Sequence, residues 1–350
     1  MKTTLKLFLF LLFCLPSWQS LHAQAAMPKP NWDRALAVES ASSVDAGPLL
    51  KNLYQLARTG KNRQLLDSLS ALEQNRNWSV PAREYVIWTF TIGLSDMEVN
   101  TVNREVLEYL SAYEPRTLVS HDDRSDAGVA LFNISAAAAG VQNLWRRQVA
   151  ANRAEFLLQS DSGQWIEAYL GAAKVERRGF IDALDFASGK QLSALANSAL
   201  ERLSVDPALT VIAGKSALIL ADPELLGQTV VLGRGPDLHR ILKAASLELN
   251  ANDSRELLYH VIRLGPEKNA GLAIAQLAPG LLGDPDVREK MFIMLENLEL
   301  GTSAALVLGS SSNPDVRSRL ENVAGGKEGR ASQRASIAIN SSYEKMEGTR

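Results

Sequence analysis

The chain has 350 residues, a single cysteine and a formal net charge of -2 at pH 7. A chain of this length buries enough surface to fold without disulfide bonds, and one cysteine cannot build a disulfide framework or a cysteine-based zinc site. The mildly acidic balance argues against nucleic acid as a partner, because binding to phosphates requires a basic face. After the N-terminal leader, no apolar run approaches the roughly 18 residues that predict a membrane-spanning helix, so we expect no integral membrane span.

Residues 1–25 have the pattern of a secretory signal peptide. Lysines precede an almost wholly apolar run from Leu7 to Trp18, and Ala23-Gln24-Ala25 then supplies small residues at a cleavable spacing. The only cysteine, Cys14, lies inside this segment. We therefore expect a cysteine-free mature chain that is secreted into the periplasm. The alternative is that these residues form a buried N-terminal helix of the mature domain.

The region after the leader divides into an arm and an irregular helical part. Residues 26–47 are of mixed composition, with prolines and a serine-rich stretch, and we interpret them as a flexible N-terminal arm. Apolar residues at helical spacing begin at Leu49, and we expect an irregular helical region over residues 48–187. No strand candidate stands out, since the apolar run from Val129 to Ile134 is short and could equally begin a helix.

The irregular region carries the candidate partner-binding residues. All tryptophans after the leader lie in the first half of the chain, and tryptophan and arginine are enriched at the hot spots of protein interfaces. Three arginines close to Trp145 could donate hydrogen bonds to a partner. The alternatives are that the tryptophans fill the core and that the arginines lie on a solvated face. The candidate residues are Trp88, Trp145, Arg146, Arg147, Arg153, His121, Asp122 and Asp123.

The cluster His121-Asp122-Asp123 is the one group in the sequence with possible chemistry. An imidazole and two carboxylates could bind a divalent cation or form part of an acid/base site. Their spacing along the chain does not place them around one point, and a solvated loop rich in aspartate is the alternative. We expect no metal and no cofactor.

A short phrase recurs in the second half at intervals of about 30 residues, a period typical of repeat architectures. It begins at Asp222, Asp253, Asp284 and Asn313, and the copy at Asp284 reads Asp-Pro-Asp-Val-Arg. An Asp or Asn at the N-cap accepts hydrogen bonds from the free amides of the first helical turn. A proline is favoured at the next position, because the amide that it lacks would have no partner within the helix. Each phrase therefore predicts the start of a helix.

Each period also contains a second break, which predicts a second helix. The breaks are Gly235-Pro236, Gly265-Pro266, Gly301 and Gly325-Gly326. Every second helix has a small residue followed four positions later by a large apolar one, and positions four apart share a helix face. These pairs are Ala245/Leu249, Ala273/Leu277, Ala304/Leu308 and Ala335/Ile339. We expect neighbouring helices to approach closely at the alanines.

The Asp-Pro-Asp-Val-Arg phrase in front of an apolar helix resembles the HEAT and HEAT-like family of helical repeats. The resemblance covers residues 222–339 and extends back to about Ser188, which gives a repeat region over 188–340 and a mobile tail over 341–350. It implies an all-α chain, an α-solenoid of stacked two-helix repeats, with an extended binding surface. Repeats of this kind serve many unrelated functions, so the resemblance specifies packing and no chemistry.

Two functions from different classes agree with these features. The first is a non-enzymatic periplasmic scaffold that binds a protein or peptide of the cell envelope, preferentially through the N-terminal half. The alternative is a hydrolase or ligand-binding enzyme of the cell envelope with a site in that half. No set of nucleophile, base and orienting group is recognisable, which favours the scaffold. Polar side chains that converge in one deep pocket would indicate the enzyme. Polar side chains that are spread along a shallow groove would indicate the scaffold.

Overall fold

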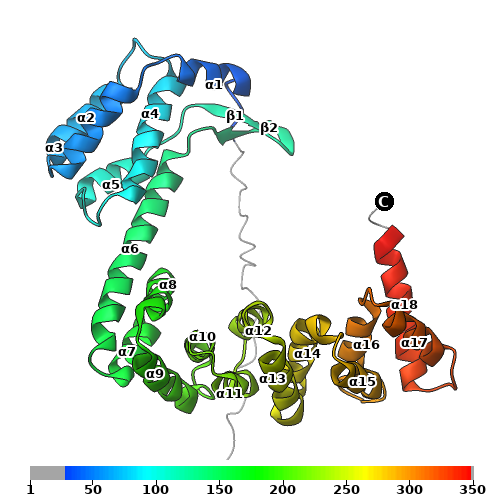
Figure 1. Cartoon of the computed structure of the whole chain (residues 1–350). Helices are drawn as coiled ribbons and strands as arrows, with labels where there is room; N and C mark the ends of the chain where they lie inside the picture. The colour runs from blue at the N-terminus through cyan, green and yellow to red at the C-terminus, as the bar shows by residue number, and fades with distance from the viewer. Residues whose placement is uncertain (1–27, 348–350) are drawn as a thin grey trace, which may run out of the picture. The chain divides into compact units, whose positions relative to one another are not determined.

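The structure is a computed structural model that describes residues 28–347, so the predicted signal peptide lies outside the described residues. The described chain is mostly α-helical (Figure 1). It divides into two compact units, residues 1–141 and 142–350, and the boundary falls inside helix α6 (Ile134–Leu158). Within residues 28–347 none of the helices is long and apolar enough to cross a membrane.

The first unit is organised around helix α4. Its elements are α1 (Arg34–Ser42), α2 (Gly47–Arg58), α3 (Asn62–Glu73), α4 (Val80–Gly93), the 3-10 helix η1 (Leu94–Asp96), α5 (Arg104–Ser111), β1 (Leu118–His121), β2 (Arg124–Ala130) and the start of α6. Helix α4 begins where the Ser79 side chain accepts a hydrogen bond from the Ala82 amide. It contacts α1, α2 and α3, and it buries Val86, Ile87 and Phe90 completely.

Helix α1 lies within residues 26–47, the segment predicted as a flexible arm. Asp33 accepts a hydrogen bond from the Leu36 amide at 3.0 Å and starts the helix, which packs on α4. The side that packs consists of Ala37 and Ala41, both buried. Two alanines four residues apart leave only a weak periodic signal in the sequence, so the helix depends on its tertiary contact.

The strands β1 and β2 form a hairpin in a stretch where no strand candidate stood out in the sequence. They pair antiparallel, with Asp122 and Asp123 at the turn. Residues near the N-terminus hold this hairpin in place: the Asn31 amide donates to the Leu118 carbonyl at 2.9 Å, and the Gly128 amide donates to the Pro28 carbonyl at 2.6 Å. These partners are distant in sequence, so the strands could not be found from a local pattern.

The second unit is an α-solenoid of helix pairs. Its elements after α6 are α7 (Ser162–Gly171), α8 (Lys174–Ala183), η2 (Leu184–Phe186), α9 (Gly189–Arg202), η3 (Pro207–Leu209), α10 (Thr210–Ile219), α11 (Pro223–Leu232), α12 (Pro236–Glu248), α13 (Ala251–Leu264), α14 (Glu267–Leu281), α15 (Pro285–Met294), α16 (Gly301–Gly309), α17 (Pro314–Ala324) and α18 (Arg330–Glu347). The second helices of the repeats, α10, α12, α14, α16 and α18, contact one another in series. Figure 1 shows α9 to α18 stacked in chain order.

The predicted helix starts are confirmed at three of the four repeated phrases. Asp222, Asp284 and Asn313 are N-cap residues whose side chains accept from first-turn amides. The phrase at Asp253 is the exception, because α13 starts three residues earlier with Asn250 as its N-cap. Asn250 accepts from the Asp253 amide at 3.0 Å and donates to the Asp253 carboxylate at 2.7 Å. Since no proline follows Asp253, the helix can extend backward to this earlier cap.

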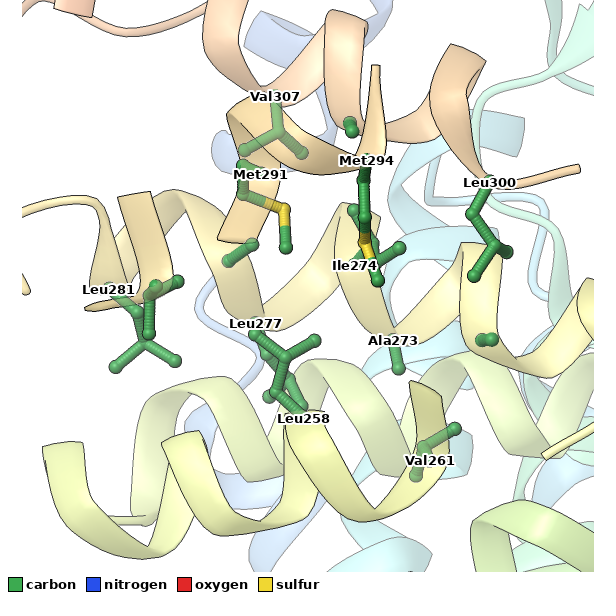
Figure 2. Close-up of a cluster of buried hydrophobic side chains, with 14 of the residues drawn as sticks. Leu258, Val261, Ala273, Ile274, Leu277, Leu281, Met291, Met294, Leu300 and Val307 are labelled. Carbon is green, nitrogen blue, oxygen red and sulfur yellow. The ribbon is translucent and has the colours of Figure 1, made fainter. Parts of the chain in front are cut away.

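The buried face of the array follows the predicted phase. The four alanines Ala245, Ala273, Ala304 and Ala335 are fully buried. Figure 2 shows one such layer, in which Ile274 and Leu277 of α14 lie between Leu258 of α13 and Met294 of α15. A regular backbone continues beyond this core, since α18 runs to Glu347 where a mobile tail had been predicted from residue 341.

Candidate functional site

A groove lies between α13 and α15. These are the first helices of two successive repeats, and both contact α14. The groove encloses about 920 Å³. Its lining residues are Glu256, Tyr259, His260, Ile262, Arg263, Asp286, Glu289, Lys290, Ile293, Met294, Asn297 and Leu300. Most of these side chains are exposed, so the groove opens to solvent along its length.

Helical periodicity explains why each wall is continuous. On α13 the residues Glu256, Tyr259 and Arg263 lie three and seven positions apart, which places them on one side of the helix. The opposite side carries Leu258 and Val261, which are fully buried against the core. The face of α13 that repeat stacking leaves uncovered therefore becomes one wall of the groove.

The wall on α15 has the same spacing. Asp286, Glu289 and Ile293 lie three and seven positions apart, and Lys290 lies beside them. Met291 is fully buried on the other side of the helix. The groove is thus formed by two matching helix faces, one from each repeat.

An ion pair aligns the two walls. Arg255 of α13 donates to the Asp284 carboxylate at 2.8 Å, and Asp284 is also the N-cap of α15. First helices of successive repeats run in the same direction in a solenoid, so this contact sets the beginnings of α13 and α15 side by side. Glu256 therefore lies at the same end of the groove as Asp286, and Arg263 lies at the far end with Ile293.

The floor at the far end is apolar. Met294 and Leu300 are buried and Ile262 is half-buried, whereas Ile293 is 60% exposed at the rim. Asn297 fixes the turn that supports this floor, because its side chain accepts from the Leu300 amide at 2.9 Å. An exposed isoleucine above buried apolar atoms is suited to cover an apolar side chain of a ligand.

The charged residues of the groove differ in whether an internal partner neutralises them. Glu289 accepts from Arg319 of α17 at 2.6 Å, and that hydrogen bond lowers the pKa of Glu289. In the described part of the chain, Arg263 and Lys290 have no ion-pair partner within 4 Å. The acidic residues at the near end, Glu256 and Asp286, are likewise exposed. The two ends of the groove consequently carry opposite charge.

Tyr259 and His260 occupy the middle of the α13 wall. Burial is the main cause that raises the pKa of Tyr259, and the carboxylates of Asp284 and Asp286 raise it further, so the phenol stays protonated and can donate a hydrogen bond. His260 packs on α11, since a Cβ added to Gly227 would lie 2.9 Å from the imidazole ring.

The candidate residues that the sequence predicted on α6 divide into buried and exposed ones. Trp145 is only 3% exposed, so its ring fills the core. Arg147 pairs with Asp182 of α8 through two hydrogen bonds. Arg146 and Arg153 are exposed, and the exposed Phe156 follows one turn after Arg153. Of the four residues, only the two exposed arginines present their side chains to a partner.

Each candidate residue of the first unit makes its contacts with other residues of that unit. Trp88 is half-buried beside Phe132, with ring centroids 5.8 Å apart. The His121 ring nitrogen Nδ1 accepts from the Asp123 amide at 3.1 Å, and Asp122 pairs with Arg34 at 3.2 Å. Among residues 28–347, no three histidine, cysteine, aspartate or glutamate side chains form a group that could hold a metal ion. The contacts of His121, Asp122 and Asp123 are those of a hairpin turn.

One buried and one half-buried acidic residue of the first unit have structural partners. Glu84 is fully buried and accepts from the amides of Arg116 at 2.6 Å and Thr117 at 3.0 Å. Glu73 accepts from the Tyr109 hydroxyl at 2.8 Å and from the Arg116 guanidinium at 2.6 Å. These bonds tie the segment before β1 to α3, α4 and α5, and each carboxylate is occupied by internal donors.

No protein-family model matches this chain, and comparisons with curated proteins and with solved structures return no match either. The groove was not found from the sequence, although one signal pointed to it. Beyond residue 190 the sequence has only three aromatic residues, and two of them, Tyr259 and Phe292, lie on the helices that form the groove.

Proposed function

We propose that this chain is a HEAT-like helical-repeat scaffold of the periplasm that binds a segment of a partner protein in the α13–α15 groove. The observation that carries the proposal is the pair of matching, exposed helix faces above an apolar floor. The predicted signal peptide over residues 1–25 supports the periplasmic location. The repeated capped helix starts support the HEAT-like relationship.

The distribution of polar groups favours a scaffold over an enzyme. Small-molecule sites enclose most of their ligand and converge a few polar groups on it. In the α13–α15 groove the polar side chains instead follow two helices for about two turns each, and most of them are exposed. His260, the one imidazole that lines the groove, packs against Gly227. A site of this form suits an elongated segment of a protein chain.

The partner is placed on the helical repeats of the second unit, whereas the sequence predicted binding through the N-terminal half. The reason is that Trp145 is buried and Arg147 is engaged by Asp182, so two of the predicted contacts are used inside the fold. By contrast, Tyr259 is half-buried with a hydroxyl that can donate, and Ile293 is largely exposed. Binding through the N-terminal half remains a separate prediction.

Site-specific photo-crosslinking in the source organism tests the proposal. A photoreactive phenylalanine analogue replaces Ile293 in the groove or, as a matched control, the exposed Leu247 of α12. The protein crosslinked at position 293 is identified with its crosslinked peptide and then purified. Its affinity is measured for the unmodified full chain and for Tyr259→Ala and Ile293→Glu, with thermal unfolding of each variant as a folding control.

We expect one partner segment to crosslink at position 293 and not at position 247. The purified partner should bind each groove variant at least about tenfold more weakly, because a hot-spot residue contributes about 2 kcal/mol or more and a tenfold change in affinity corresponds to about 1.4 kcal/mol. Equal crosslinking at both positions, or unchanged affinity for both folded variants, contradicts the proposed function.

A further inference from the structure

The α13–α15 groove has a charge order along its length. Glu256 and Asp286 lie at the end where Arg255 and Asp284 align the two helices. Arg263, at the last turn of α13, lies at the other end. Lys290 lies one turn before the floor residue Met294 on α15. Because Arg319 neutralises Glu289, the charge of the groove runs from acidic to basic.

The distance between the charged ends limits the length of a complementary ligand. Glu256 and Arg263 are seven positions apart on one helix, which corresponds to about 10 Å at a rise of about 1.5 Å per residue. An extended peptide advances about 3.3 Å per residue. Two ligand groups that contact the two ends at once therefore belong to residues about three positions apart.

The apolar floor lies at the basic end. Met294 and Leu300 are buried there, and Ile293 projects at the rim. An apolar ligand side chain placed on this floor brings its own backbone close to Lys290 and Arg263. The basic side chains would then meet a carboxylate on the same or the next ligand residue, in a charge-assisted hydrogen bond.

Resting on the proposed function, we propose that the groove selects an amphoteric peptide segment with a defined direction. The segment carries a lysine or arginine facing Glu256 and Asp286, and about three residues later an apolar side chain over Met294 and Leu300. A carboxylate follows that apolar residue directly and binds Arg263 and Lys290. The chain terminus or an aspartate or glutamate side chain can supply this carboxylate.

Synthetic peptides test the segment chemistry directly on the full mature chain. The parent peptide is fluorescein-labelled Gly-Gly-Lys-Ala-Ala-Leu with a free C-terminal carboxylate. The same peptide with an amide terminus removes the carboxylate, and amide-capped Gly-Gly-Lys-Ala-Ala-Leu-Asp returns it as a side chain directly after the leucine. Replacing the lysine of the parent with glutamate reverses the charge at the other end. Fluorescence anisotropy gives the dissociation constants.

Charge variants of the groove locate the contacts. Arg263→Glu and Lys290→Glu reverse the basic end, and Glu256→Lys reverses the acidic end. The matched controls are Lys243→Glu and Glu248→Lys, two exposed positions on α12 outside the groove. Since acidic side chains near a helix start and basic side chains near a helix end also stabilise the helix, urea unfolding of every variant accompanies the binding measurement.

We expect the parent peptide to bind at least about tenfold more tightly than the amide-terminated and the glutamate peptides. Arg263→Glu should weaken the parent by a similar factor, and Lys243→Glu should leave it unchanged. The aspartate peptide recovers the affinity if a side-chain carboxylate suffices, and stays weak if the chain terminus is required. Equal binding of all peptides, or binding of none, overturns the inference.

The inference and the proposed function can fail separately. A partner that crosslinks at position 293 through a segment without this charge order overturns the inference and leaves the scaffold function intact. Conversely, peptides that bind as expected while position 293 crosslinks no more than position 247 leave the segment chemistry intact and contradict the scaffold function in the cell.

Discussion

Arg255 of α13 donates at 2.8 Å to Asp284, the N-cap residue of α15, so a single carboxylate joins two successive repeats. The same carboxylate accepts from the Asp286 amide at 2.8 Å. Both partners of the ion pair are partly shielded from solvent. The contact thus caps one helix and aligns it with its neighbour, which sets the register of the groove walls.

Because Asp284 both caps α15 and pairs with Arg255, we predict that the loss of stability on replacing it with asparagine depends on pH. The Arg255 guanidinium is the largest cause that lowers the pKa of Asp284, followed by the Asp286 amide. A carboxyl with a lower pKa in the folded state stabilises the fold at pH values above its pKa in the unfolded state, near 4, and loses that contribution as the pH falls through its pKa in the folded state.

We expect Asp284→Asn to be less stable than the native chain at pH 7, because asparagine still caps but has no charge. The difference should narrow as urea unfolding is repeated at decreasing pH below 4. A difference independent of pH would show that the charge of Asp284 has no part in the stability of the fold.

A second prediction concerns the layer between α13 and α14. Leu258 is fully buried and lies against α14 in Figure 2. Leu258→Ala should lower the free energy of unfolding by about 2 to 5 kcal/mol, since it removes apolar atoms and leaves a cavity. Leu247→Ala is the matched control, because Leu247 is 77% exposed, and it should change the free energy by less than about 0.5 kcal/mol. Similar urea midpoints for the two variants would contradict the packing described here.

The repeat array was predictable because its signals are local. Asp222 and Asn313 each cap a helix that starts at the next residue, and alanines such as Ala273 share a face with residues four positions away. The start of α13 was misplaced at Asp253 because two good capping residues, Asn250 and Asp253, lie in one stretch. Local chemistry alone does not decide between such neighbouring caps.

Features that depend on distant residues could not be predicted. The β1–β2 hairpin is held by Pro28 and Asn31, and the groove exists because α13 and α15 each pack on α14. Trp145 is a similar case, since its position near three arginines is equally consistent with a core residue and with an interface residue. Only its burial decides between them.

A third prediction concerns a buried amide that links two repeats. Asn269 of α14 is 6% exposed, and its Nδ2 donates to the Val230 carbonyl at 2.7 Å and to the Gly233 carbonyl at 3.0 Å. Both carbonyls belong to the end of α11, where helix carbonyls lack partners inside the helix. Asn269→Ala should cost about 1 to 3 kcal/mol of unfolding free energy, because it leaves them without their donor.

Asn269→Asp separates the loss of a donor from the loss of volume. The aspartate has the size of the asparagine, but its carboxylate faces the same carbonyl oxygens, so we expect it to destabilise the chain at least as much as the alanine. Asn252→Ala, at an exposed position on α13, serves as the surface control. If Asn269→Asp were as stable as the native chain in urea, the amide would not serve as the donor to α11.

The last prediction concerns the contact between the N-terminal segment and the hairpin. A Cβ at Gly128 would lie 2.7 Å from the Pro28 carbonyl oxygen and 2.9 Å from the Lys29 carbonyl carbon. Both are backbone atoms, which cannot rotate away as the end of a flexible side chain can. Gly128→Ala should therefore displace the segment from β2 and break the hydrogen bond from the Gly128 amide to Pro28.

Limited proteolysis measures this displacement. We expect cleavage within residues 28–32 to be faster in Gly128→Ala, because the displaced backbone becomes accessible to the protease. Gly140→Ala is the matched control: Gly140 lies inside α6 with nothing within 4 Å of an added Cβ, and alanine favours a helix by up to about 1 kcal/mol over glycine. It should leave the cleavage rate unchanged or lower it. Equal cleavage of the two variants would mean that the segment does not depend on the close approach at Gly128, and that the bonds of Asn31 and Trp32 to Leu118 and of Asn31 to Arg116 suffice to hold it.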